Sequence, residues 1–217
     1  MSAFHNQLQL YLFKNKLNQK SLIEFLTQFS EQTVKSILSD LGLNESKEHK
    51  EKLYVFSDGN VKRNGKIDAR GGYSVYFGDT LPYSQFNKTK IITSQPTNNK
   101  AELLGVKQIF KTIYLNQELF KNKHTIICTD SQYSINCITK WSTEWQRNNW
   151  KNSKGEDVKN KQLIKDILSL KDNLDVTLDF KHVFGHTKEP IDKNSLEWMY
   201  WYGNFKVDSD INTLLMK

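Results

Sequence analysis

LYVFSDG, residues 53–59, is a short apolar and aromatic run that ends in an acid and a glycine. A run of this length, rich in aromatic and β-branched residues, is typical of a buried strand. A glycine directly after the acid permits a tight turn. We therefore expect a central strand that carries Asp58 at its end, with the carboxylate pointing out of the sheet to a place where a reaction could occur.

The composition of the 217-residue chain allows one ordinary domain with an appendage, or two small domains. Its 37 % hydrophobic and 12 % aromatic residues are enough to build a core. Lys and Arg total 31 against 24 Asp and Glu, which gives a net charge of +7. This charge suits a polyanionic partner such as nucleic acid, although many basic proteins bind none.

The cysteine content and the termini indicate an intracellular protein. Cys128 and Cys137 are too few for a disulfide scaffold in a chain of this length and suggest a reducing compartment. No long uncharged apolar run predicts a membrane span, and residues 1–15 lack the layout of a secretory signal. We expect the protein in the cytoplasm or the nucleus, without a membrane partner.

Residues 1–50 are expected to form a helical hairpin, separate from a second domain over 51–217. Apolar residues recur at the helical spacing i, i+3, i+4, i+7 at 22–29 and again at 34–41, and Gly42 fits a helix stop. The hairpin is interpreted as a packing appendage, with contact to a protein partner as the alternative.

The chain after residue 60 predicts an α/β fold with a mixed sheet. Short turns between the first strands favour an antiparallel meander, and the later alternation of helices and strands favours parallel pairing. Strands are expected at 71–78, 88–93, 124–129 and 176–183, and helices at 97–120, around 138–145, at 161–170 and from about residue 204, after an irregular aromatic-rich segment.

Three acids occupy comparable positions in these elements. Asp58 and Asp130 each follow a buried strand, and Glu102 lies in the first turn of a helix. Glu102 shares the apolar stripe of that helix, where an ionised carboxylate needs a basic side chain or a metal as its partner. A solvated glutamate that is favourable to the helix dipole is the alternative.

A fourth acid is either Asp208 or Asp210, and periodicity does not choose between them. If the strands that carry Asp58 and Asp130 are neighbours, their ends lie about 5 Å apart. Carboxylates gathered there would repel one another unless divalent cations occupied the site. Oxygen ligands suit Mg²⁺ or Mn²⁺, and two such ions about 4 Å apart could cleave a phosphodiester.

Four blocks of sequence, taken together, resemble type 1 ribonuclease H of the RNase H-like superfamily, from about Leu53 to the C-terminus. The blocks are YVFSDG at 54–59, TNNKAE at 97–102, TDS at 129–131, and GH at 185–186 followed by GN at 203–204 and VD at 207–208. The resemblance implies the RNase H-like fold, a five-stranded mixed sheet of three antiparallel and then two parallel strands, flanked by helices.

The resemblance also implies an activity. An enzyme of this family is an endonuclease that hydrolyses the RNA strand of RNA/DNA hybrids with two Mg²⁺ ions, or Mn²⁺, and leaves 5′-phosphate and 3′-hydroxyl ends. His186 would assist proton transfer or product release from a mobile loop; without the resemblance it would be interpreted as structural. The implied metal ligands are Asp58, Glu102, Asp130 and Asp208, the last chosen over Asp210 because it fits the pattern Gly-Asn-x-x-Val-Asp.

Residues that would contact the hybrid are polar or aromatic. The 2′-hydroxyl that marks RNA is reached across a shallow minor groove, and an Asn side chain both donates and accepts. Turn chemistry is the alternative for asparagine, and core packing is the alternative for tryptophan. The resemblance implies RNA contacts at Asn64, Asn98, Asn99 and Gln132, and DNA contacts at Trp141, Trp145, Trp150, Thr97 and Asn160.

Three other readings stay open. A proofreading-type exonuclease of the same fold would carry Glu at position 60, where Asn60 stands, and an integrase would lack the Gly-His loop. A catalytically weak or inactive hybrid-binding protein would gain little from acids placed beside phosphates. A structural module that uses the N-terminal hairpin leaves the acids unexplained.

Overall fold

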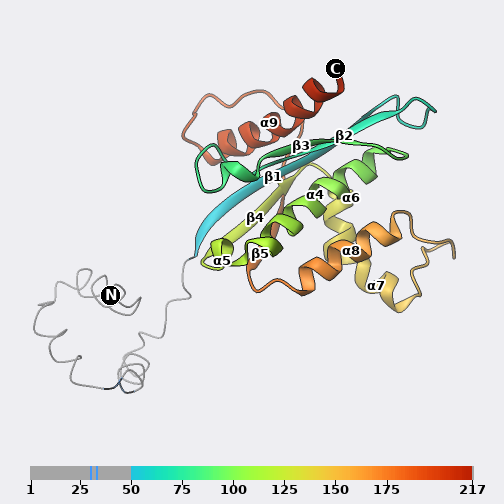
Figure 1. The fold of residues 1–217 in the computed structure, drawn as a ribbon, viewed down its shortest axis with the longest axis horizontal. Coiled ribbons are helices and arrows are strands. Elements are labelled where there is room, and N and C mark those ends of the chain that lie inside the picture. Colours follow the sequence, from blue (N-terminus) through green and yellow to red (C-terminus); the bar gives the residue numbers. More distant parts are fainter. Residues whose placement is uncertain (1–29, 31–32, 34–49, 217) are drawn as a thin grey trace, which may run out of the picture. The chain divides into compact units, whose positions relative to one another are not determined.

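A five-stranded mixed sheet lies at the centre of residues 50–216 (Figure 1). The computed structural model describes these residues together with Ser30 and Thr33. The helical hairpin expected over 1–50 falls almost entirely outside the described residues, so that prediction stays open. Among the described helices, none is both long and apolar enough to cross a lipid bilayer.

The strand order confirms the predicted sheet. Strands β1 and β2 pair antiparallel, as do β2 and β3, whereas β4 pairs parallel with both β1 and β5. The order across the sheet is β3-β2-β1-β4-β5, so β1 is central. The strands are β1 (Glu51–Lys62), β2 (Arg70–Tyr76), β3 (Lys88–Ile92), β4 (Lys123–Thr129) and β5 (Thr177–His182).

Asp58 is not at the end of its strand, as the sequence had led us to expect. β1 continues to Lys62 because its second half stays paired with β2. Its parallel pairing with β4 stops earlier, at Phe56 opposite Cys128. Asp58 therefore lies two residues beyond the last residue that β4 covers, and the expectation of a turn at Gly59 is wrong.

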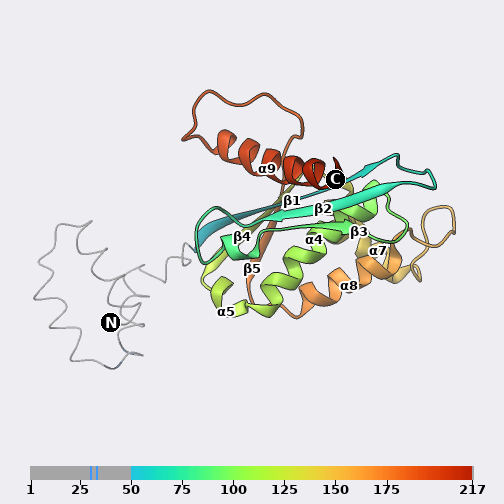
Figure 2. The same ribbon diagram turned by 45° about the horizontal axis from the view of Figure 1, so that its top comes forward.

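Helices cover both faces of the sheet. Helices α4 and α8 pack against each other on one face, and α9 crosses β1 and β2 on the other (Figures 1 and 2). A π-helical turn at 137–141 joins α6 to α7. The helices are α4 (Asn98–Leu115), α5 (Gln117–Phe120), α6 (Gln132–Asn136), α7 (Ser142–Arg147), α8 (Lys161–Asp172) and α9 (Leu196–Met216).

The first of these helices begins where the sequence predicts. Thr97 is the N-cap of α4, and its side-chain oxygen accepts a hydrogen bond from the Lys100 backbone nitrogen at 3.3 Å. The apolar stripe of α4, which includes Val106 and Ile109, is fully buried in the core between the helix and the sheet. The helix ends at Leu115 and a separate turn, α5, follows, so the single helix expected to Phe120 is interrupted at Asn116.

Helix α9 begins at Leu196, eight residues before the expected start. The aromatic segment interpreted as irregular is helical, and its spacing carried the signal. Trp198, Trp201, Tyr202 and Phe205 recur at i, i+3, i+4 and i+7, which is the period of a helix face. The later apolar positions of α9 behave as expected, since Val207, Ile211 and Leu215 are buried.

Candidate active site

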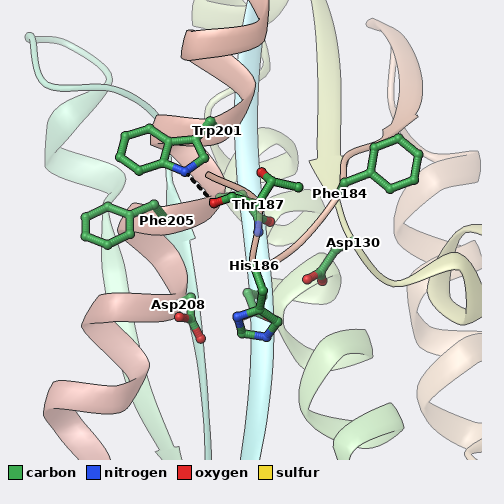
Figure 3. A pocket seen from close by; sticks show the side chains of 9 residues that line it. Asp130, Phe184, His186, Thr187, Trp201, Phe205 and Asp208 are labelled. Carbon is green, nitrogen blue, oxygen red and sulfur yellow. Dashed lines mark hydrogen bonds between the residues drawn. The ribbon is translucent and has the colours of Figure 1, made fainter. Parts of the chain in front are cut away.

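Three acids that are far apart in the sequence line one cavity of about 70 Å³ (Figure 3). Asp58 comes from β1, Asp130 follows β4, and Asp208 comes from α9. The sheet brings the first two together because β1 and β4 are neighbours, and α9 packs across β1 from one face. The other residues that line the cavity are Phe184, His186, Thr187, Trp201, Asn204 and Phe205.

Asp58 is the most buried of these acids, with 8 % of its surface exposed. Its Oδ1 accepts a hydrogen bond from the Gly59 backbone nitrogen at 2.6 Å. Burial, followed by the negative charge of Asp130, raises the pKa of Asp58 to about 7, while the hydrogen bond from Gly59 opposes the shift. A buried carboxylate with acidic neighbours is poorly stabilised by the protein alone, so this position favours a cation.

Glu102 lies beside the cavity in the early part of α4. Its Oε2 is buried and has no hydrogen-bond partner among the described residues. Burial, and after it the charges of Asp58 and Asp130, raise the pKa of Glu102 to about 8. The acid predicted on the apolar stripe is therefore close enough to the other two for their charges to affect its pKa, and within residues 50–216 no basic side chain pairs with it.

Asp130 is held by neighbours on two sides. Burial raises its pKa, and the polar side chain of nearby Asn204 has the largest opposing effect. Its backbone oxygen accepts a hydrogen bond from the Nε2 atom of His182 at 3.1 Å. A Cβ atom added to Gly185 would overlap the Asp130 Oδ2 atom, so a larger residue where this loop passes the acid would displace the carboxylate.

The structure brings Asp208, and not Asp210, to the cavity. The Oδ1 of Asp208 accepts a hydrogen bond from Asn212 Nδ2 at 3.0 Å, and Asn212 Oδ1 accepts one from Asn60 Nδ2 at 3.2 Å. Asp210 pairs instead with Lys206, at 2.9 Å. The sequence analysis did not identify Asn212 and Asn60 as supports of Asp208, because nothing in their spacing along the chain relates them.

His186 lies in the loop between β5 and α9 and lines the cavity, where its ring lies between Asp130 and Asp208 (Figure 3). Its backbone φ is +53°, a left-handed conformation that is uncommon for a residue with a side chain. The next residue is tied to α9, since the Trp201 indole nitrogen donates to the Thr187 carbonyl oxygen at 3.0 Å. The structure thus places His186 with the acids, as the sequence predicts.

The residues expected to contact RNA lie outside the cavity. Asn98 and Asn99 are exposed in the first turn of α4, and Asn64 is exposed in the turn that follows β1. Gln132 is exposed at the start of α6, where its amide donates to Asn136. These side chains are accessible to a ligand, and their contact with RNA stays a prediction.

The tryptophans expected to contact DNA form a continuous chain of rings. The ring centroids of Trp141 and Trp145 are 5.7 Å apart, and those of Trp145 and Trp150 are 6.4 Å apart. Trp141 is 37 % exposed, whereas Trp150 is 8 % exposed and belongs to the core. The packing alternative therefore describes Trp150 well.

Asn160, also expected to contact DNA, has a φ of +58°, and its side-chain amide donates a hydrogen bond to the Tyr133 hydroxyl at 3.4 Å.

The donor set fits a hard divalent cation. Carboxylate oxygens are the ligands that Mg²⁺ prefers, and a buried oxygen without a partner, such as Oε2 of Glu102, is one that a cation would satisfy. Within residues 50–216, however, no three His, Cys, Asp or Glu side chains are already grouped as a metal site. The side chains would have to draw together around an ion.

Comparison with known proteins identifies the family of the chain. The family model for RNase H matches residues 50–198. The chain belongs to the RNase H family, which confirms the resemblance and the α/β fold class. The match ends before Asp208, so the placing of that acid beside the cavity rests on the tertiary structure and not on the family model.

Individual relatives give the same picture. The chain is 31 % identical to mouse Ribonuclease H1 over 138 residues, which are 63 % of this chain and 45 % of the relative. It is 34 % identical to Ribonuclease H of Schizosaccharomyces pombe over 135 residues, 62 % of this chain and 47 % of the relative. The chain spans about half the length of these curated relatives. The solution structure of the PFV RNase H domain aligns with a TM-score of 0.53 at 18 % identity, over 74 % of this chain and 92 % of that domain.

Proposed function

We propose that the protein is an endoribonuclease that hydrolyses the RNA strand of RNA/DNA hybrids with the help of divalent metal ions. One observation carries the proposal. Acids from three separate elements, Asp58, Asp130 and Asp208, line one cavity together with His186, in a chain of the RNase H family. Its curated relatives are named ribonuclease H, which supports the same substrate class.

The four acids Asp58, Glu102, Asp130 and Asp208 would hold the cations. Mg²⁺ is the ion we propose, two of them per site, with Mn²⁺ as a substitute. Bound there, such ions supply an activated water and stabilise the oxygen that leaves the phosphodiester. The raised pKa values of Asp58 and Glu102 come first from burial and then from the neighbouring negative charges, and a bound cation would oppose both effects.

The protein's own groups perform the remaining steps. The water oxygen forms a bond to phosphorus as the bond between phosphorus and the 3′ oxygen breaks, which leaves a 5′-phosphate and a 3′-hydroxyl. His186 lines the cavity, with its ring between Asp130 and Asp208, and can hold the proton that the 3′ oxygen takes up. Asn212 keeps Asp208 in orientation through a hydrogen bond from its side-chain amide.

The N-terminus of α4 is the part of the surface that we assign to recognition of RNA. Asn98 and Asn99 are exposed there, and each amide can both donate to and accept from a 2′-hydroxyl. The positive end of the helix dipole favours a nearby phosphate. Double-stranded DNA lacks the 2′-hydroxyl, so it gains only the phosphate contacts and is a poorer ligand.

The direct test is cleavage of an end-labelled RNA/DNA hybrid in Mg²⁺, with double-stranded RNA and double-stranded DNA of the same sequence alongside. We expect cuts within the RNA strand of the hybrid alone, and none in the presence of a chelator or with Asp58→Asn. Equal cutting of all three duplexes would contradict the proposal. Tight binding of the hybrid without any cutting would identify a binding protein instead.

A further inference from the structure

Two aromatic side chains of α9 line the same cavity as the acids. Trp201 and Phe205 stack, with ring centroids 5.1 Å apart and an angle of 8° between the ring planes. Both line the cavity with Asp208, which follows Phe205 by three residues on the same face of the helix. Phe205 is 50 % exposed, so this stack is accessible, and the chemistry proposed for the acids does not use it.

The polar edge of Trp201 is already occupied. Its indole nitrogen, the one hydrogen-bond donor of the side chain, donates to the Thr187 carbonyl oxygen (Figure 3). What the pair still offers to a ligand is the flat apolar surface of its rings. Such surfaces bind other flat π-systems, and nucleobases stack on them with little regard to sequence.

The rings lie within reach of a nucleotide whose phosphate is at the acids. Along α9, Phe205 and Trp201 precede Asp208 by three and seven residues, which correspond to about 4.5 Å and about 10 Å of helix rise. Successive nucleotides of one strand lie about 3.4 Å apart when stacked and farther apart when they are unstacked. The stack therefore lies beside a nucleotide one to three positions from the bond to be cleaved.

We propose that Trp201 and Phe205 form a stacking subsite for an unpaired base of the RNA strand, next to the hybrid. A base inside the duplex has both faces covered, and extruding it requires unstacking and unpairing. A base in a single-stranded RNA tail has a free face. The inference rests on the proposed function, because the acids set the position of the phosphate, and it adds hybrids with single-stranded RNA tails as a preferred substrate class.

The same helix provides a matched control. Trp198 and Tyr202 have the same spacing and stack at 4.8 Å and 9°. The Trp198 indole nitrogen also donates a hydrogen bond, to Glu189 Oε1 at 3.0 Å. This second pair does not line the cavity. Trp198 itself packs against Trp201, with ring centroids 6.3 Å apart, so the control is made at its partner. Tyr202→Leu removes the equivalent stack while Trp198 stays in place beside Trp201.

The experiment measures binding to two fluorescein-labelled hybrids of identical duplex sequence, one blunt and one with a short unpaired RNA tail, in a chelator and at low ionic strength. We expect the unmutated protein to prefer the tailed hybrid. Phe205→Ala is expected to weaken binding of the tailed hybrid by roughly tenfold and to leave the blunt hybrid unchanged. Tyr202→Leu should retain the preference, and so should Trp201→Phe, which keeps an aromatic ring but loses the hydrogen bond to Thr187.

Two results would overturn the inference. The unmutated protein could bind both hybrids equally well, or Phe205→Ala could weaken binding of both hybrids to the same extent. If Phe205→Ala fails to fold by circular dichroism, Phe205→Leu, which keeps apolar bulk without a ring, replaces it with the same expectations. Cleavage assays separate the two proposals. A tail preference without cleavage of any hybrid counts against the proposed activity alone, whereas cleavage without a tail preference counts against the subsite alone.

Discussion

Gly59 lies directly against the backbone of Glu102, so closely that a Cβ atom on Gly59 would overlap the Glu102 backbone nitrogen. This contact sets the first turns of α4 onto β1 immediately beside Asp58. It therefore brings the acid of the strand and the acid of the helix to the same place. The glycine serves close approach, and not the turn that its position in the sequence suggested.

Gly59→Ala is expected to push α4 away from β1. The forced displacement should lower the free energy of unfolding by about 1–3 kcal/mol, the usual effect of overpacking, and should reduce cleavage by separating Asp58 from Glu102. Denaturant unfolding measures the first effect. Gly105→Ala is the control, because its Cβ would meet the Ser57 Cβ at 3.2 Å and alanine is the better helix former. If Gly105→Ala lowers the free energy of unfolding as much as Gly59→Ala does, the close contact at Gly59 is not what distinguishes the two positions.

Asp58→Asn should abolish cleavage and stabilise the metal-free protein. The pKa of Asp58 is about 7 in the folded state against an ordinary value of 3.8, so the unfolded chain loses this proton first as pH rises. The contribution of Asp58 to stability therefore falls between about pH 4 and about pH 7 and is constant above that range. The amide side chain in the Asp58→Asn variant does not titrate, so it adds no such pH dependence to the stability.

The measurement is thermal unfolding in a chelator at several pH values. At pH 8, Asp58→Asn should raise Tm by roughly 3 °C or more, since one pKa unit corresponds to about 1.4 kcal/mol and 1 kcal/mol shifts the Tm of a chain this size by about 2–4 °C. At pH 4 the two proteins should unfold at similar temperatures. A lower Tm for the variant at pH 8 would sink the prediction. Asp210→Asn, which removes an ion-paired acid outside the cavity, should not raise Tm.

Asp208→Asn and Asp210→Asn are expected to differ sharply in activity. Asp208 lines the cavity with the other acids, whereas Asp210 points to Lys206. Loss of a residue that only supports a metal ligand typically lowers activity by roughly 10- to 100-fold. We expect Asp208→Asn to lower activity by more than this, and Asp210→Asn to keep activity close to that of the unmutated protein. Initial rates on the hybrid at saturating Mg²⁺ give the comparison, and the opposite order would assign the fourth ligand to Asp210.

Asn212→Ala should lower activity without unfolding the protein. The Asn212 amide links Asn60 to the Asp208 carboxylate by hydrogen bonds of 3.2 and 3.0 Å. Loss of such a supporting partner typically lowers metal affinity or activity by roughly 10- to 100-fold. A titration of rate against Mg²⁺ concentration should show a higher requirement for the ion. An unchanged Mg²⁺ requirement with a lower plateau would show that Asn212 acts in some other way.

Both cysteines should be inert in the folded protein. Burial raises the pKa of Cys128 to about 12 and that of Cys137 to about 11, and neither thiol is in a disulfide. Because the thiolate is the reactive form, a chromogenic disulfide reagent at pH 8 should detect almost no thiol until denaturant is added, and then two per chain. Rapid reaction of either thiol in the native state would mean that the core around it opens readily.

Much of the fold follows from local patterns in the sequence. Each predicted strand is present within a few residues of its expected bounds, because alternation and apolar runs report burial directly. The start of α4 follows from the capping chemistry of Thr97. Helix α9 shows where the approach fails, since its crowded aromatic residues were interpreted as irregular although they have the spacing of a helix.

The sequence by itself determined the order of the elements, the strand that carries Asp58 and the acids Glu102 and Asp130, because each depends on residues that are neighbours along the chain. The pattern at 203–208 selected Asp208 over Asp210, and the tertiary structure supplied its place beside the other acids. Only the tertiary structure decided that Gly59 is a contact and not a turn, and that Trp201 and Phe205 border the same cavity. Those features depend on how α4 and α9 cross the sheet, and crossing geometry arises from packing between segments that are distant in the sequence.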